Sequence, residues 1–156
     1  MKIYWITLFV MLAGLLMVSC SDASPHPHQA ELRAAFERSE EVLAEARLNL
    51  DTSRLSEAFT KEGLPDILEA LKAAEDTVFR AEEIEIDWVA VIEYNPPEAI
   101  IEVKYFYRAY TYNRETGEIA YDSEPRRYWR ILKYRMRQED GIWKVDEALE
   151  FVDWSG

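Results

Sequence analysis

The side chains best suited to chemistry in this chain are polar residues expected on an otherwise apolar sheet face. Alternation with a period of two in the C-terminal half predicts that face, which carries Tyr105, Tyr107, Arg130, Tyr134 and Glu147. Arginine, carboxylate and tyrosine hydroxyls together could hold an anionic or polar ligand. The alternative is a structural Arg130–Glu147 ion pair near the open end of the sheet, with the tyrosine hydroxyls turned to solvent.

Catalysis is not expected from the residue types available. Residues 30–156 contain neither histidine nor cysteine, which excludes nucleophilic schemes built on Ser/His or Cys/His. A carboxylate base with a tyrosine donor is chemically possible, and Glu147 is the candidate base. A neighbouring Arg130 would favour the charged carboxylate and weaken it as a base. We therefore expect a non-catalytic binding or protein-interaction function. The alternative is a pocket enzyme of the isomerase or hydratase type that uses a carboxylate and tyrosines.

Metals, cofactors and nucleic acids have little support in the sequence. His26 and His28 alternate with prolines, but two ligands without a third or fourth make a weak metal site. No glycine-rich phosphate loop is present. Thirty acidic residues against eighteen basic ones give a net charge of −12, which argues against a nucleic-acid partner. We expect no metal, no cofactor and no nucleic acid.

One predicted strand is strongly basic, although the net charge of the chain is negative. Residues 126–137 hold six arginines and lysines and no acid. Cross-strand pairing with Glu93, Glu102, Asp146 and Glu150 would make this a solvated face. Alternatively, basic and aromatic side chains on the outer sheet face form an interface for a protein partner or a second copy. The candidate interface residues are Phe106, Tyr110, Tyr112, Trp129, Lys133, Arg135 and Arg137.

The N-terminus has the composition of an export signal. Lys2 is followed by an almost wholly apolar stretch that ends in Val18-Ser19-Cys20. This segment resembles a bacterial lipoprotein signal, although Met17 stands where that motif prefers leucine. The resemblance implies removal of residues 1–19, lipidation of Cys20 and anchoring to a bacterial cell or outer membrane, facing the periplasm or exterior. The alternative is an uncleaved signal anchor or an ordinary secretory signal, and either one also places the domain outside the cytoplasm.

A tether and then helices follow the signal. Residues 20–29 are small, polar and proline-containing, and are expected to be flexible. Helical spacing then puts one apolar stripe on a single face: Leu32, Phe36, Ser39, Leu43, Ala46 and Leu50. The opposite face carries five acids, which we interpret as a solvated surface: Glu31, Glu37, Glu40, Glu41 and Glu45. A short helix is expected to end near Gly63, and another to start at Pro65.

The remaining residues are expected to form an antiparallel sheet. Strands are predicted over 84–94, 100–112, 126–138 and 142–152, with an Asp-Gly turn at 140–141. Alternation places Trp88, Ala90, Ile92 and Tyr94 on the face that packs against the helices. Helices followed by strands predict one α+β domain over residues 30–156.

This pattern resembles the NTF2-like superfamily, a cystatin-like α+β cone. The matching features are a long first helix, two short ones, and a sheet that ends in the stretch Asp140–Val145. The stretch Leu50–Leu55, followed by Gly63-Leu64, is similar to the IMS-like domain within that superfamily. The resemblance implies a curved sheet around helices, with a pocket on the concave side. Some members of the superfamily are enzymes and many only bind ligands or partners, and the IMS-like group works through protein contacts.

Overall fold

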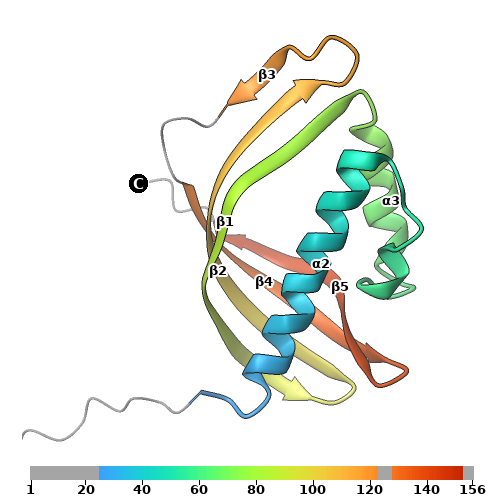
Figure 1. Cartoon of the computed structure of the whole chain (residues 1–156). Helices are drawn as coiled ribbons and strands as arrows, with labels where there is room; N and C mark the ends of the chain where they lie inside the picture. The colour runs from blue at the N-terminus through green and yellow to red at the C-terminus, as the bar shows by residue number, and fades with distance from the viewer. Residues whose placement is uncertain (1–24, 123–127, 153–156) are drawn as a thin grey trace, which may run out of the picture.

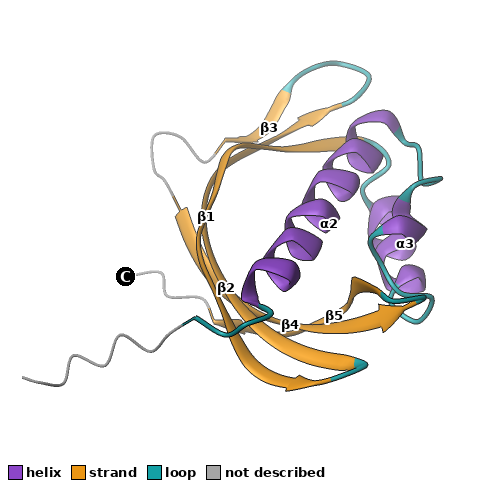
Figure 2. Cartoon of the chain, turned by 60° about the horizontal axis from the view of Figure 1, so that its bottom comes forward, coloured by secondary structure: helices purple, strands orange, loops and turns teal. Residues whose placement is uncertain are grey.

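Helices lie on the concave side of a curled antiparallel sheet (Figures 1 and 2). The computed structural model describes residues 25–122 and 128–152, so the predicted signal and Cys20 lie outside the described residues. Within the described part, helices come first in the sequence and strands follow. This arrangement confirms the predicted α+β class.

The long helix α2, Gln29–Asn49, provides most of the helical side of the core. It buries five members of the stripe that its spacing predicted, namely Leu32, Phe36, Ser39, Leu43 and Ala46. It also buries Ala35 and Val42, which the prediction did not include. The one polar member is satisfied, because the Ser39 hydroxyl donates a 2.7 Å hydrogen bond to the Phe36 carbonyl. The stripe stops before Leu50, which adopts a left-handed conformation (φ 55°), ends the helix and is 46% exposed.

Two shorter helical segments follow, η1 at Leu55–Glu57 and α3 at Leu64–Ala73. Pro65 lies in the first turn of α3, where a missing N–H costs nothing. None of the α3 side chains is fully buried, although Leu64, Ile67 and Leu71 pack partly against the core. This helix therefore covers the sheet loosely compared with α2.

The loop before α3 is held against the last strand. Phe59 forms a parallel bridge with Val145, and the Thr60 amide donates a 3.0 Å hydrogen bond to the Val145 carbonyl. A Cβ on Gly63 would lie 2.1 Å from the Asp146 carbonyl oxygen, so only glycine fits here. Gly63 has φ −79°, so close approach rather than a left-handed helix end explains it.

The sheet has the strand order β1-β2-β4-β5, and the short β3 pairs with one end of β2. All described pairings between these strands are antiparallel. The strands are β1 at Thr77–Asn95, β2 at Glu98–Asn113, β3 at Ile119–Asp122, β4 at Tyr128–Glu139 and β5 at Ile142–Val152. Asp140 (φ 53°) and Gly141 (φ 78°) make the predicted two-residue turn between β4 and β5. The sequence did not predict β3 or the early start of β1.

Bulges in β1 reverse part of the predicted face assignment. Its register with β2 shifts between residues 86 and 88 and again between residues 91 and 93. Each extra residue inverts the alternation. Val89 is therefore 2% exposed in the core, while Trp88 and Ala90 pair with outward-facing positions of β2, and Ile92 is 49% exposed. The prediction that these three residues face the helices is wrong. Only Tyr94 of that set packs against the core.

Candidate functional site

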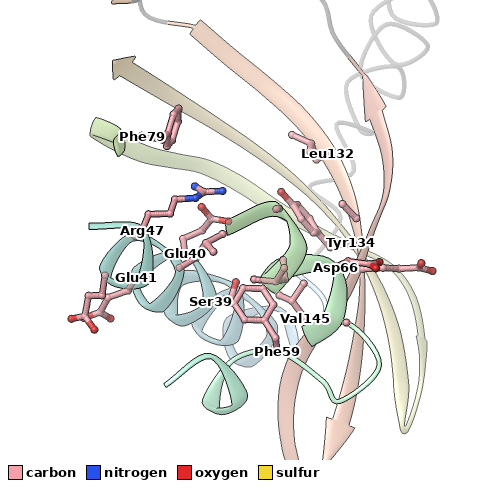
Figure 3. A pocket seen from close by; sticks show the side chains of 18 of the residues that line it. Ser39, Glu40, Glu41, Arg47, Phe59, Asp66, Phe79, Leu132, Tyr134 and Val145 are labelled. Atoms are coloured by element: carbon pink, nitrogen blue, oxygen red, sulfur yellow. The ribbon is translucent and has the colours of Figure 1, made fainter. Parts of the chain in front are cut away.

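A cavity of about 1000 Å³ lies between α2, α3 and the concave face of the sheet (Figure 3). Helices and sheet thus leave open space where a tightly packed domain would place side chains. The volume is at the upper end of the roughly 300–1,000 Å³ that small-molecule sites occupy. The apolar part of the wall includes Leu43, Leu48, Phe59, Ile67, Leu132 and Val145.

Helix α2 places two side chains of opposite charge in this cavity. Glu40 and Arg47 lie two helical turns apart, on the same side as the buried Leu43. Figure 3 shows both side chains pointing into the cavity, whereas Glu41 points away from it. The interpretation of Glu40 as part of a solvated surface is therefore wrong. The spacing of Glu40, Leu43 and Arg47 was the signal that could have revealed this shared face.

Burial shapes the electrostatics of this pair. Burial raises the pKa of the Glu40 carboxyl, and the positive charge of Arg47 partly opposes that effect. Burial likewise lowers the pKa of the Arg47 guanidinium, and the negative charge of Glu40 partly opposes it. Neither side chain forms an ion pair within 4 Å in the described part of the chain. Instead, the Arg47 guanidinium lies 5.1 Å from the centre of the Phe79 ring.

Tyrosines from the sheet face the same space. Tyr105 on β2 and Tyr134 on β4 line the cavity, and their hydroxyl groups interact. Burial is the main cause that raises the pKa of each, and the charge of Glu40 adds to it. Both phenols therefore stay protonated at neutral pH, and because one hydroxyl donates its single proton to the other, the pair offers one hydroxyl donor to a ligand.

Arg130 and Tyr107 complete the polar part of the wall. The Arg130 guanidinium lies 4.7 Å from the centre of the Tyr107 ring, and both residues line the cavity. Four of the five residues that the sequence singled out thus lie around one cavity: Tyr105, Tyr107, Arg130 and Tyr134.

The fifth residue, Glu147, has a different partner from the one expected. Its carboxylate forms an ion pair with Arg135, its cross-strand neighbour on β4, and its side chain is 47% exposed. The register of β4 and β5 shifts between Arg135 and Met136, which makes Asp146 the extra residue and turns Glu147 outward. The expected Arg130–Glu147 pair is therefore wrong. Glu147 borders the cavity, but Glu40 provides the carboxylate inside it.

The outer face of the sheet carries the predicted mixture of aromatic and basic residues. Phe106 and Trp129 are cross-strand partners, with the Lys104 ammonium 5.2 Å and 5.6 Å from their ring centres. The sequence did not single out Lys104, which also forms a 2.9 Å ion pair with Asp87.

Several of the predicted interface residues make contacts within the chain. The Arg137 guanidinium lies 3.1 Å from Glu98 and 3.4 Å from Asp146. Tyr110 and Tyr112 stack with their ring centres 6.0 Å apart. Lys133 stands opposite two acids in the register, Glu102 and Glu150. Cross-strand pairing with acidic residues therefore accounts for some of the basic side chains on this strand.

The two histidines lie against the domain. The rings of His26 and His28 lie 5.1 Å and 4.3 Å from the ring of Tyr94, and His28 stacks on it. Among residues 25–122 and 128–152, no three or more His, Cys, Asp or Glu side chains are grouped to hold a metal ion. No helix in this same part combines the length and apolar character needed to cross a bilayer.

Comparison with known proteins found a similar structure but no similar sequence. No protein-family model matches the chain, and no curated protein matches its sequence. The structure is similar to the crystal structure of the intermembrane space region of the chloroplast protein ARC6, with a TM-score of 0.65. The match covers 83% of this chain and 100% of that one at 12% sequence identity. At this identity the likeness shows a shared fold alone.

Proposed function

We propose that the domain binds an amphipathic small molecule in the cavity beneath α2 and α3, without catalysing a reaction on it. The supporting observation is the cavity itself, about 1000 Å³ in volume, with Glu40 and Arg47 inside it and no ion pair within 4 Å for either among the described residues. Half-buried charges without an ion-pair partner carry a desolvation cost, and a bound ligand would offset that cost. A structural core would have been filled by apolar side chains instead.

The proposal also includes a cellular location and a protein family. The lipoprotein-like sequence before Cys20 supports anchoring to a bacterial membrane and an extracytoplasmic domain. The ARC6 region with a similar fold comes from an intermembrane space, which agrees with an IMS-like, NTF2-like domain outside the cytoplasm. A protein partner or a second copy on the outer sheet face is compatible with a ligand in the cavity, because the two surfaces are separate.

One observation favours an enzyme as the second candidate. Glu40 is a carboxyl whose pKa is raised by burial, and it shares the cavity with the protonated Tyr105 and Tyr134. A carboxylate base with phenolic donors is the arrangement that an isomerase or hydratase would need. Glu40 therefore takes the place that the sequence assigned to Glu147.

The test is a search for a retained small molecule. The full chain is purified from its native membrane, and an organic extract is analysed by mass spectrometry. Ala44→Trp on α2 would fill the cavity, and Arg38→Trp on the exposed side of the same helix is the matched control. We expect a species that is present in the wild type and in Arg38→Trp but lost in Ala44→Trp. An extract that is identical for all three would contradict the proposal.

A further inference from the structure

We propose that the head group of the bound molecule is dipolar, with its positive group beside Glu40 and its negative group beside Arg47. The apolar tail of the same molecule would lie against the wall formed by α3 and the sheet. This inference rests on the proposed binding function and names the chemical class of the ligand.

The separation of the two charges leaves room for a head group between them. Seven residues along an α-helix correspond to a rise of about 10 Å, so the backbones of Glu40 and Arg47 are well separated. Both side chains reach into the cavity from the same helix face (Figure 3). No ion pair within 4 Å joins them or any other described side chain to either group. Each is thus available to a ligand group of opposite sign.

The surroundings of the pair favour the same arrangement. Tyr105 and Tyr134 line the cavity from the sheet, close enough to interact with the charges of both Glu40 and Arg47. Arg130, above the ring of Tyr107, adds a second positive charge from β4. The negative part of a ligand can pair with Arg47, and its positive part with Glu40.

Ligands with other charges fit this lining less well. A purely anionic head group would be repelled by the ionised Glu40, and a purely cationic one would be repelled by Arg47. An uncharged head group would leave both buried charges without partners, which carries a desolvation cost. Only a dipolar head group satisfies both side chains at once.

The rest of the cavity suits an apolar chain. Leu43, Phe59, Ile67 and Leu132 line it from three elements and an intervening loop, and Ala70 and Ala74 leave space along α3. Apolar surface removed from water contributes roughly 25 cal/mol per Å². The tail would supply affinity and the head group would supply selectivity.

The experiment varies the head group at a constant tail. Equilibrium dialysis uses the full chain in amphipol, with amphipol alone as the blank and every amphiphile below its micellar concentration. The probes share a twelve-carbon tail: dodecylphosphocholine, 2-aminotetradecanoic acid, tridecanoate, dodecyltrimethylammonium and dodecyl maltoside. The first two are dipolar, and they distinguish a lipid-type head group from an amino-acid type.

We expect at least one dipolar probe to bind about tenfold more tightly than dodecyl maltoside, the effect of one charge-assisted hydrogen bond of ~1.4 kcal/mol. Glu40→Gln and Arg47→Gln should each remove most of that preference, because each leaves only one charged partner for a dipolar head group. Glu41→Gln, on the residue that points away from the cavity, is the matched control and should behave as the wild type.

The possible failures are distinguishable. Equal affinity for all five probes would overturn the dipolar head group and leave the binding function standing. Preference for tridecanoate that depends on Arg47 alone would also overturn it, in favour of a simple anion. No saturable binding of any probe would overturn both this inference and the proposed function.

Discussion

The Thr60 hydroxyl donates a 2.5 Å hydrogen bond to Oδ1 of Asp146, joining the loop before α3 to the bulge in β5. The same hydroxyl oxygen accepts a 3.0 Å hydrogen bond from the Gly63 amide. The other Asp146 oxygen lies 3.4 Å from the Arg137 guanidinium. This chain of contacts fixes the start of α3 relative to the sheet, and so fixes one wall of the cavity.

The first prediction removes that hydroxyl. Thr60 is 0% exposed, so Thr60→Val keeps the shape of the side chain while removing the hydrogen-bond partner of the Gly63 amide and of Asp146 Oδ1. We expect a loss of about 1–3 kcal/mol in the free energy of unfolding, measured by urea denaturation. Thr52→Val, at an exposed threonine, is the control and should change stability by less than about 0.5 kcal/mol. Equal effects of the two substitutions would contradict the role given to Thr60.

The second prediction adds one carbon atom at Gly63. Because the Asp146 carbonyl lies 2.1 Å from the position of a Cβ, Gly63→Ala requires α3 or β5 to move. Overpacking of this kind costs about 1–3 kcal/mol, which a lowered urea midpoint would report. Lys61→Ala, two residues earlier on the exposed side of the loop, should leave the midpoint nearly unchanged. An unchanged midpoint for Gly63→Ala would show that the contact is not tight.

Local patterns allowed much of the fold to be predicted. The buried stripe of α2 follows from helical spacing, and the turn at Asp140 and Gly141 follows from residues that tolerate positive φ. The face assignments failed where bulges add a residue, as at Trp88 in β1 and Asp146 in β5. Bulges depend on pairing with a neighbouring strand, so alternation along one strand does not reveal them.

The cavity was harder to predict than the fold. Four of its polar residues lie on regular stretches of β2 and β4, where alternation gives the correct face: Tyr105, Tyr107, Arg130 and Tyr134. Glu40 was missed because an acid beside other acids on a helix is usually solvated. Only the position of α2 within the curve of the sheet separates Glu40 from Glu41, and that position is a tertiary property.

The third prediction concerns the outer face of the sheet as an interface between copies of the chain. A photo-crosslinking amino acid in place of Phe106 would lie beside Trp129. We expect a crosslinked product of twice the chain mass in membranes, reduced severalfold by Trp129→Ala, because aromatic side chains dominate such interfaces. The same amino acid in place of Glu37, on the exposed side of α2, is the control. Equal crosslinking from both positions would contradict a specific interface.

The fourth prediction concerns Cys20, which lies outside the described residues. The sequence before it resembles a lipoprotein signal, so the mature chain should begin at a Cys20 that carries acyl groups. Intact mass spectrometry of the membrane-extracted protein should show the mass of residues 20–156 plus lipid. Cys20→Ala should abolish that species and leave the longer precursor. An unmodified Cys20, or a cut elsewhere, would contradict the prediction.

The fifth prediction uses the pH dependence of stability. Burial raises the pKa of the Glu40 carboxyl above the ordinary value of 4.5, so the folded protein binds this proton more tightly than the unfolded chain does. Its stabilising effect is fully present below pH 4.5 and is lost as the pH rises through the raised pKa. Glu40→Gln cannot ionise, so its stability relative to the wild type should increase from pH 4 to pH 8 in urea titrations. Glu41→Gln should keep a constant difference from the wild type, since Glu41 is exposed. A difference between Glu40→Gln and the wild type that stays constant with pH would show that Glu40 is not desolvated in the folded protein.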